Sequence, residues 1–180
     1  MDKKIDKNNL AVLVVDMQQG FFKKPYETDL EPSKEELILS QKEVIKECIE
    51  KKIPLIYIEC RGMGKTIEPL RRLLKNAKAK KIKKNYACGF SQPHLKKHLK
   101  KIGRNQLYFS GILSDACVYS TALGALALDD PEIEIISSSK DVISTTKFAN
   151  FHEKEKAQNL FTFDERGIFT ETYQEIFSKL

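Results

Sequence analysis

The sequence predicts an α/β fold in which helices cover both faces of a parallel β-sheet. Short apolar runs rich in β-branched residues alternate along the chain with segments whose apolar residues recur at helical spacing. The first run, Leu10–Val15, is apolar at every position, which is typical of a strand covered on both faces. With 180 residues, 41% of them hydrophobic, we expect a single domain over residues 1–180 with its own core.

In the first half of the chain, apolar runs and helical patterns alternate regularly. A Ser33–Glu36 capping box marks the start of the first long helix, and residues 23–31 look like a loop. The run PLIYIE predicts the second strand, and KKIKK predicts a third that carries Lys84 to the sheet edge. The predicted order is strand 10–15, helix 34–52, strand 54–59, helix 67–75 and strand 80–84.

The second half continues the alternation. Residues 93–101 form an amphipathic helix that ends at Gly103, and residues 117–128 form a helix rich in Ala and Leu. Residues 138–150 are polar and predict a loop. The remaining predicted elements are strands 106–110, 132–137 and 168–169, and helices 152–160 and 171–180.

Charge and composition narrow the function classes. The net charge is +6, and lysines are densest in residues 75–84. Because this run has little arginine or aromatic interleaving, a solvated lysine-rich surface is favoured over nucleic-acid binding. The sequence shows no apolar signal core and no apolar run near the ~20 residues of a membrane span. We therefore expect a cytoplasmic protein without nucleic-acid or membrane partners, in which the four cysteines are reduced thiols.

Three ionisable residues follow predicted strands: Asp16, Lys84 and Cys117. The carboxyl ends of parallel strands share one edge, so these side chains can converge there. Cys117 begins a predicted helix, where the helix N-terminus favours the thiolate, the nucleophilic form. Two structural alternatives stay open at this point, namely a buried structural cysteine and an aspartate that caps a loop or helix.

A thiol, a carboxylate and an ammonium in contact suffice for acyl transfer to water without a metal. The ammonium stabilises the thiolate, the carboxylate moves the proton, and backbone N–H groups before Cys117 hold the developing oxyanion. The three histidines lie in charged helical surroundings and are interpreted as surface residues: His94, His98 and His152.

Three segments resemble the motifs of the isochorismatase-like, or cysteine hydrolase, family. The segment from Val14 to Phe22 resembles its opening signature, and Lys84 with Phe90 matches the spacing of its lysine segment. The segment from Gly111 to Val118, with Thr121, Ala122 and Ala125, closely matches its cysteine segment. The resemblance extends over nearly the whole chain in the right order.

The resemblance implies a three-layer αβα, Rossmann-like architecture with a six-stranded parallel sheet in the order 3-2-1-4-5-6. It also implies a catalytic triad of Asp16, Lys84 and Cys117, and a non-proline cis peptide between Ile112 and Leu113. That peptide would turn the Leu113 N–H toward the oxyanion beside the N–H of Cys117. Homo-oligomers are common in such a family, so we expect a dimer or larger assembly.

Some segments depart from the family pattern. Nicotinamidases of this family carry an Asp-x-His metal segment after the second strand, whereas this chain has Glu59-Cys60-Arg61. We therefore expect neither a metal site nor a cofactor. Candidate substrate-binding residues are Gln18, Phe21, Phe22, Arg61, Tyr86, Phe90 and Tyr119; core packing is an equal alternative for the aromatic ones, and an exposed loop position is the alternative for Arg61.

The resulting hypothesis is a hydrolase that cleaves a small-molecule amide or related C–N bond through a Cys117 thioester. Asp16 would serve as general base and acid, and Lys84 would stabilise the thiolate. Two other functions stay open: vinyl ether hydrolysis of the isochorismatase type, and a non-catalytic binding or assembly role. The sequence does not identify the substrate.

Overall fold

A computed structural model describes residues 4–23, 32–128, 130–143, 158–162 and 164–180. Within them the strands form one seven-stranded sheet in which the paired strands run parallel. The main path runs β3-β2-β1-β4-β5-β7. Because β7 is the strand predicted as the sixth, at residues 168–169, this path confirms the predicted order 3-2-1-4-5-6. The additional short strand β6 pairs with β4 beside this path. The strands are β1 (Leu10–Val15), β2 (Leu55–Cys60), β3 (Lys80–Lys84), β4 (Gln106–Ile112), β5 (Glu134–Ser138), β6 (Val142–Ile143) and β7 (Gly167–Thr170).

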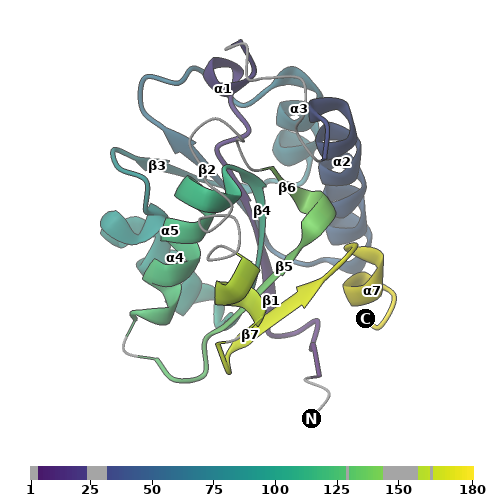
Figure 1. The fold of residues 1–180 in the computed structure, drawn as a ribbon, viewed down its shortest axis with the longest axis vertical. Coiled ribbons are helices and arrows are strands. Elements are labelled where there is room, and N and C mark those ends of the chain that lie inside the picture. Colours follow the sequence, from purple (N-terminus) through teal and green to yellow (C-terminus); the bar gives the residue numbers. More distant parts are fainter. Residues whose placement is uncertain (1–3, 24–31, 129, 144–157, 163) are drawn as a thin grey trace.

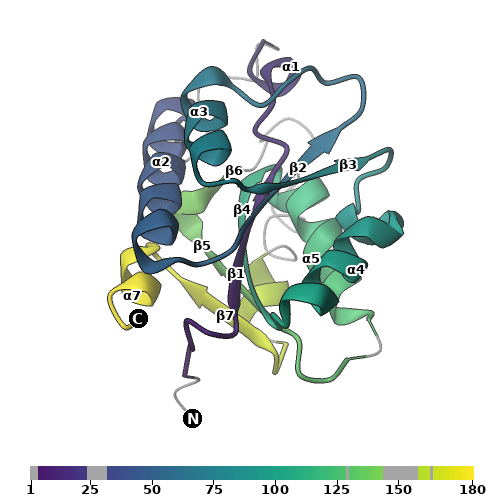
Figure 2. The ribbon, with the colours of Figure 1, turned by 180° about the vertical axis from the view of Figure 1, so that it is seen from behind.

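Helices cover both faces of the sheet, as the two opposite views in Figures 1 and 2 show. The group α2, α3 and α7 lies against one face, and α4 and α5 lie against the other. This confirms the three-layer αβα architecture. The α-helices with assigned bounds are α1 (Gln19–Lys23), α2 (Lys34–Lys51), α3 (Glu68–Asn76), α4 (Pro93–Ile102), α5 (Tyr119–Leu126) and α7 (Gln174–Phe177).

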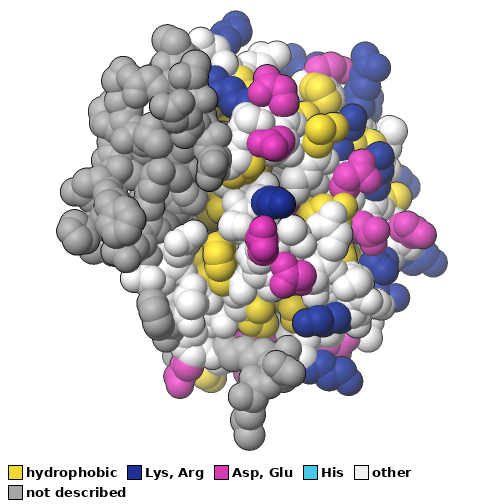
Figure 3. Space-filling view, turned by 45° about the vertical axis from the view of Figure 1, so that its right-hand side comes forward, with side chains coloured by type: hydrophobic (Ala, Val, Ile, Leu, Met, Phe, Trp, Pro, Cys, Tyr) yellow, Lys and Arg dark blue, Asp and Glu magenta, His cyan; other side chains and the backbone are white. Residues whose placement is uncertain are grey.

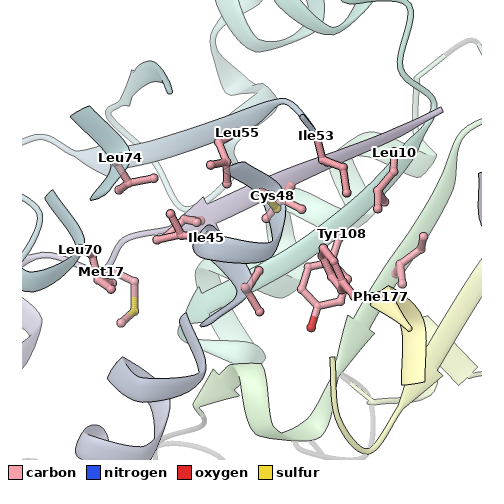
Figure 4. Packing of buried hydrophobic residues seen from close by; sticks show 14 of the residues in the cluster. Leu10, Met17, Ile45, Cys48, Ile53, Leu55, Leu70, Leu74, Tyr108 and Phe177 are labelled. Atoms are coloured by element: carbon pink, nitrogen blue, oxygen red, sulfur yellow. The ribbon is translucent and has the colours of Figure 1, made fainter. Parts of the chain in front are cut away.

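The central strand β1 feeds two hydrophobic cores because its side chains alternate between the faces. Leu10, Val12 and Val14 join the core under α2 and α3, whereas Ala11, Leu13 and Val15 join the core under α4 and α5. All six residues are buried, as predicted for a strand covered on both sides. Figure 4 shows the first core, where Tyr108 of β4 packs edge-to-face on Phe177 with ring centroids 5.6 Å apart.

Two differences from the predicted elements lie next to Cys117. β4 continues to Ile112, and Ser114–Val118 form a single π-helical turn before α5 begins at Tyr119. Cys117 therefore lies inside the π turn and not at the start of a regular helix. The capping box at Ser33 is present as predicted, with Glu36 completing it.

The C-terminal third differs more from the prediction. The predicted loop 138–150 contains a 3₁₀ turn at Ser139–Asp141 and the short strand β6. The predicted last helix, 171–180, is reduced to α7. Residues 144–157, which include His152 and most of the predicted helix 152–160, lie outside the described residues, as do residues 24–31 of the predicted loop.

On the molecular face in Figure 3, acidic and basic side chains are intermingled, with small apolar areas between them. Among the described residues no helix combines the length and apolar character that crossing a membrane requires.

Candidate active site

Asp16, Lys84 and Cys117 meet at the carboxyl edge of the sheet. Asp16 directly follows β1, Lys84 ends β3, and Cys117 lies in the π turn after β4. The Lys84 Nζ is 2.8 Å from the Asp16 Oδ2, and both side chains are fully buried. The Cys117 thiol lies close enough to both that their charges influence its acidity. The structure thus brings the three predicted residues together, and their catalytic role stays a prediction.

Close approach of two strands shapes the edge on which these residues lie. Gly111 of β4 has a φ of +119°, and a Cβ there would lie 2.1 Å from the carbonyl oxygen of Val15. Any side chain at this position would force β1 and β4 apart, immediately before Asp16 and the cysteine turn. The peptide bond between Ile112 and Leu113 is cis, as the family resemblance implies.

Thr121 of α5 lies four residues after Cys117 and links the π turn that contains Cys117 to the loop that follows Lys84. Its Oγ1 donates to the Cys117 carbonyl oxygen at 2.6 Å and accepts from the Gly89 N–H at 3.0 Å. On the loop side, the Lys84 Nζ donates to the Ala87 carbonyl oxygen at 2.5 Å. Through these bonds Thr121 helps to fix the position of the Cys117 backbone relative to the loop that holds the Lys84 ammonium. The sequence matched it to the family motif without assigning it a role, and only its spacing of four from Cys117 could have indicated one.

Burial dominates the acidity of the thiol. Burial first, and the charge of Asp16 second, raise the pKa of Cys117 to about 12, although the Lys84 ammonium lowers it. This corrects the expectation that the resting thiolate is favoured at a helix N-terminus. Cys117 lies within a π turn and is partly buried, and desolvation of the thiolate outweighs the attraction of one ammonium.

Asp16 is also desolvated. Burial raises the pKa of its carboxyl group, and the positive charge of Lys84 in the ion pair offsets part of that rise. A carboxylate with a raised pKa is a better proton acceptor than an ordinary aspartate. Its backbone φ of +53° is left-handed, a conformation that Asp tolerates better than most residues.

The residues at the nicotinamidase metal position do not fit a metal. Glu59 is buried, and its Oε1 accepts hydrogen bonds from the N–H and hydroxyl of Thr66. Its Oε2 forms an ion pair with the Lys81 Nζ at 2.5 Å. Burial alone would raise the pKa of Glu59, but these bonds from Lys81 and Thr66 lower it. Among the described residues no group of three or more His, Cys, Asp or Glu side chains could hold a metal ion.

Gln18 is already committed to the protein backbone. Its buried amide donates to the carbonyl oxygens of Cys60 at 2.9 Å and Gly64 at 2.7 Å, and accepts from the Cys60 N–H at 2.7 Å. These contacts hold the loop after β2 against the end of β1. Its predicted role in substrate binding stays a prediction, and a substrate would compete with these bonds.

The other predicted pocket residues are dispersed. The two phenylalanines of α1, Phe21 and Phe22, are partly buried against the α2–α3 core. Tyr86 is 70% exposed, whereas Phe90 packs against the α4–α5 core. Tyr119 is partly buried at the start of α5.

Arg61 lines a separate surface groove of about 450 Å³. Lysines of β3 and α4 make up half of its lining residues, His94 and His98 also line it, and none of the lining residues is acidic. Arg61 is exposed in the loop after β2, and its predicted part in binding a substrate carboxylate stays a prediction.

Two further cysteines follow or end strands of the sheet: Cys60 is the last residue of β2, and Cys88 lies in the loop after β3. Asp16 and Lys84 both influence the acidity of Cys60, whose pKa is raised mainly by burial. Cys88 packs so closely on Gly124 of α5 that a Cβ at Gly124 would lie 2.5 Å from the Cys88 Sγ. The sequence did not assign Cys60 to the site, although it follows the predicted second strand as Asp16 follows the first.

A larger hollow of about 810 Å³ borders the π turn that contains Cys117, and Lys84 does not line it. Its walls include Ser114 and Val118 of the π turn, the N-terminal half of α2, and the segments after β5 and β7. Sequence reasoning missed it because residues far apart in the chain form it.

The model of the isochorismatase domain matches residues 10–137, which include Asp16, Lys84 and Cys117. The chain belongs to the isochorismatase family. Among solved structures, the YcaC gene product of Escherichia coli, described as an octameric hydrolase of unknown specificity, aligns with a TM-score of 0.78 and 20% identity over 98% of this chain and 81% of that one. No curated protein matches the chain.

Two other solved structures with the same fold have different named activities. The MAR1 ribonuclease of Caenorhabditis elegans aligns with a TM-score of 0.76 and 20% identity, covering 99% of this chain and 84% of that one. The nicotinamidase SaPncA of Staphylococcus aureus aligns with a TM-score of 0.70 and 20% identity, covering 87% and 96%. At this identity the likeness establishes the shared fold, and the activity has to be argued from the site.

Proposed function

We propose that this isochorismatase-family member is a metal-independent hydrolase of a small-molecule amide or related C–N bond, acting through a thioester on Cys117. The observation that supports this most is the fully buried ion pair of Asp16 and Lys84, whose charges both influence the acidity of the Cys117 thiol. A buried ion pair is costly to maintain, and perturbed acidities in one cluster are typical of catalytic sites.

In the first half-reaction, Asp16 takes the proton of Cys117 while the Sγ attacks the substrate carbonyl carbon. The N–H groups of Leu113 and Cys117 stabilise the resulting oxyanion. As the tetrahedral intermediate collapses, the C–N bond breaks and the protonated Asp16 gives its proton to the departing amine. The products of this step are the free amine and a Cys117 thioester.

In the second half-reaction, Asp16 takes a proton from water, and the oxygen of that water attacks the thioester carbonyl. The C–S bond then breaks, the carboxylic acid leaves, and the thiolate regains the proton from Asp16. Lys84 stabilises the thiolate whenever it forms, because its ammonium lowers the pKa of Cys117. The raised resting pKa of the thiol makes the base necessary, since little thiolate forms without proton transfer.

The remaining elements of the proposal concern substrate and assembly. The substrate is a small molecule bound near Gln18, Phe21, Phe22, Arg61, Tyr86, Phe90 and Tyr119. No cofactor takes part. A homo-oligomer is proposed, and the octameric assembly named for the YcaC protein supports it. The ribonuclease among the similar structures gives a reason to include RNA in the test.

The decisive experiment is a hydrolysis screen with intact-mass detection of the enzyme. Wild type and the Cys117→Ala and Asp16→Asn variants are incubated with amides, ureides, isochorismate and a short RNA. The proposal expects C–N cleavage by wild type, an acyl adduct on the Cys117 peptide, and loss of both in Cys117→Ala. Turnover of isochorismate alone, without an adduct, would favour vinyl ether hydrolysis. No turnover of any compound, together with an ordinary thiol titration near ~8.5, would favour a non-catalytic member.

A further inference from the structure

A second buried carboxylate, Asp141, lies on the other flank of the cysteine turn and has no part in the proposed proton transfers. It is fully buried and accepts three hydroxyl hydrogen bonds, each from a different element. Ser40 of α2 donates to its Oδ1, while Tyr108 of β4 and Ser138 of β5 donate to its Oδ2. In Figure 4 the Tyr108 ring lies beside Phe177, with its hydroxyl at the rim of the core.

The backbone of Asp141 is tied to the same elements. Its carbonyl oxygen accepts from the Gln41 Nε2 at 2.9 Å, and the Gln41 Oε1 accepts from the Ser110 hydroxyl at 3.0 Å. Ser110 belongs to β4 and directly precedes Gly111. The network therefore joins α2, β4 and β5 through residues that are buried or partly buried, where hydrogen bonds are stronger and their loss is costly.

The next residue after Asp141 begins β6. In the sheet register Val142 pairs with Gly111 and Ile143 pairs with Ile112, the last two residues of β4. Leu113 follows at once, and its carbonyl oxygen accepts from the Val118 N–H at 2.9 Å to close the π turn that contains Cys117. Asp141 is thus one residue from the strand that flanks the peptide carrying the Leu113 N–H.

On the other side of β4, the same stretch is fixed by β1. Val15 pairs with Gly111 and packs so closely on it that no side chain fits. The end of β4 is therefore held between β1 and β6. The Asp16 side is secured by the long pairing of β1 with β4, whereas the β6 side has only two paired residues and depends on the anchoring that precedes them.

We propose that Asp141 is a positioning residue: by anchoring β6 against the end of β4 it fixes the Leu113 N–H relative to Cys117. This inference rests on the proposed function only in giving that N–H an oxyanion to stabilise. The anchoring itself is a statement about the fold. A carboxylate suits the task because its two oxygens accept from three donors at once, whereas an amide has one acceptor oxygen and would require some of the hydroxyls to turn and accept from its N–H groups.

The test compares Asp141→Asn with Gln106→Leu, a matched loss at the opposite end of β4. Gln106 is buried and likewise makes three hydrogen bonds, to the Asp6 N–H, the Lys4 carbonyl oxygen and Glu134. Hydrogen exchange is followed by mass spectrometry on peptides that cover residues 106–118. In Asp141→Asn we expect exchange at residues 111–118 to rise by about tenfold or more relative to Gln106→Leu. Equal exchange in the two variants would overturn the proposal.

Kinetics separate positioning from thiol activation. We expect acylation of Cys117 in Asp141→Asn to slow by about 100-fold, the effect of losing one oxyanion donor, while alkylation by iodoacetamide stays within about threefold of wild type. Equal losses in both reactions would refute the assignment. If wild type forms no acyl-enzyme, the proposed function fails while the exchange result still decides the anchoring. Should Asp141→Asn not fold, Tyr108→Phe, which removes one donor and keeps the ring, takes its place in both measurements.

Discussion

Replacing Lys84 with Met removes the only ammonium within ion-pair distance of Asp16 among the described residues. Both side chains have zero exposure, so solvent cannot take the place of the lost partner. Breaking a buried pair by removing one member costs about 3–5 kcal/mol, because an uncompensated charge is left behind. The hydrogen bond from the Lys84 Nζ to the Ala87 carbonyl oxygen is lost too, and that adds about 1 kcal/mol. We therefore expect Lys84→Met to lose several kcal/mol of unfolding free energy at pH 7.5.

The pH dependence gives this prediction its sign. Burial already raises the pKa of Asp16, and without Lys84 the pKa rises further. An acid whose folded pKa exceeds its unfolded value stabilises the fold below the unfolded pKa, and this stabilisation is lost as pH rises through the folded pKa. The deficit of Lys84→Met should therefore shrink as pH falls from 7.5 toward 5, by up to about 1.4 kcal/mol per pH unit.

Urea unfolding at several pH values measures the effect, with Lys83→Met as the control. Lys83 is the exposed neighbour on β3, and its replacement should change stability by less than about 0.5 kcal/mol. The double variant Asp16→Asn/Lys84→Met should recover part of the loss, since it removes the stranded charge. A loss below about 1 kcal/mol that is also independent of pH would show that Asp16 does not depend on Lys84.

Three other substitutions or titrations follow from the site. Gly111→Ala should lower the free energy of unfolding in urea by about 3 kcal/mol or more, because its Cβ would lie 2.1 Å from the Val15 carbonyl oxygen. The control Gly62→Ala, also at positive φ but with no atom within 4 Å of its Cβ, should lower it by only about 1–2 kcal/mol. Equal losses in the two variants would refute the steric argument. Iodoacetamide alkylation of the Cys117 peptide should keep accelerating above pH 9, since burial raises the pKa of this thiol; a plateau near ~8.5 would contradict it. Gln18→Leu removes three hydrogen bonds and should lose about 2–4 kcal/mol, whereas an unchanged midpoint would mean that the loop after β2 holds itself.

Strand positions were the most predictable part of the fold, because burial on both faces leaves a direct trace in composition. Leu10–Val15, which is buried at every position, has the predicted bounds. Lys80–Lys84 also has the predicted bounds, although only Ile82 and Lys84 of this strand are buried. β6 was missed because its two residues, Val142 and Ile143, are too few to show a pattern. The strand exists because Asp141 is anchored by side chains from α2, β4 and β5, and such contacts have no signature at short sequence spacing.

The grouping of site residues was predictable for a related reason. Parallel strands deliver their carboxyl ends to one edge, so Asp16, Lys84 and Cys117 could be brought together from strand positions alone. The positions of the predicted substrate-binding residues could not be derived in this way, because the direction of their side chains depends on the conformation of loops. Arg61 follows β2 as Asp16 follows β1, yet it lines a groove among lysines of β3 and α4.

The acidity of the thiol shows most clearly where local reasoning stops. From the sequence, a cysteine at a helix N-terminus predicts a stabilised thiolate. In the structure, Cys117 shares a desolvated site with a carboxylate, and burial outweighs Lys84. A resting thiolate would need no base, and Asp16 could then serve only as an acid. In the proposed reaction the thiol is protonated at rest, so nucleophilic attack requires that Asp16 accept its proton as the Sγ–C bond forms. Burial suppresses the thiolate and also raises the pKa of the Asp16 carboxyl group. The two pKa values therefore lie closer together than they would if only the thiol were buried, and transfer of the proton from Cys117 to Asp16 costs less free energy.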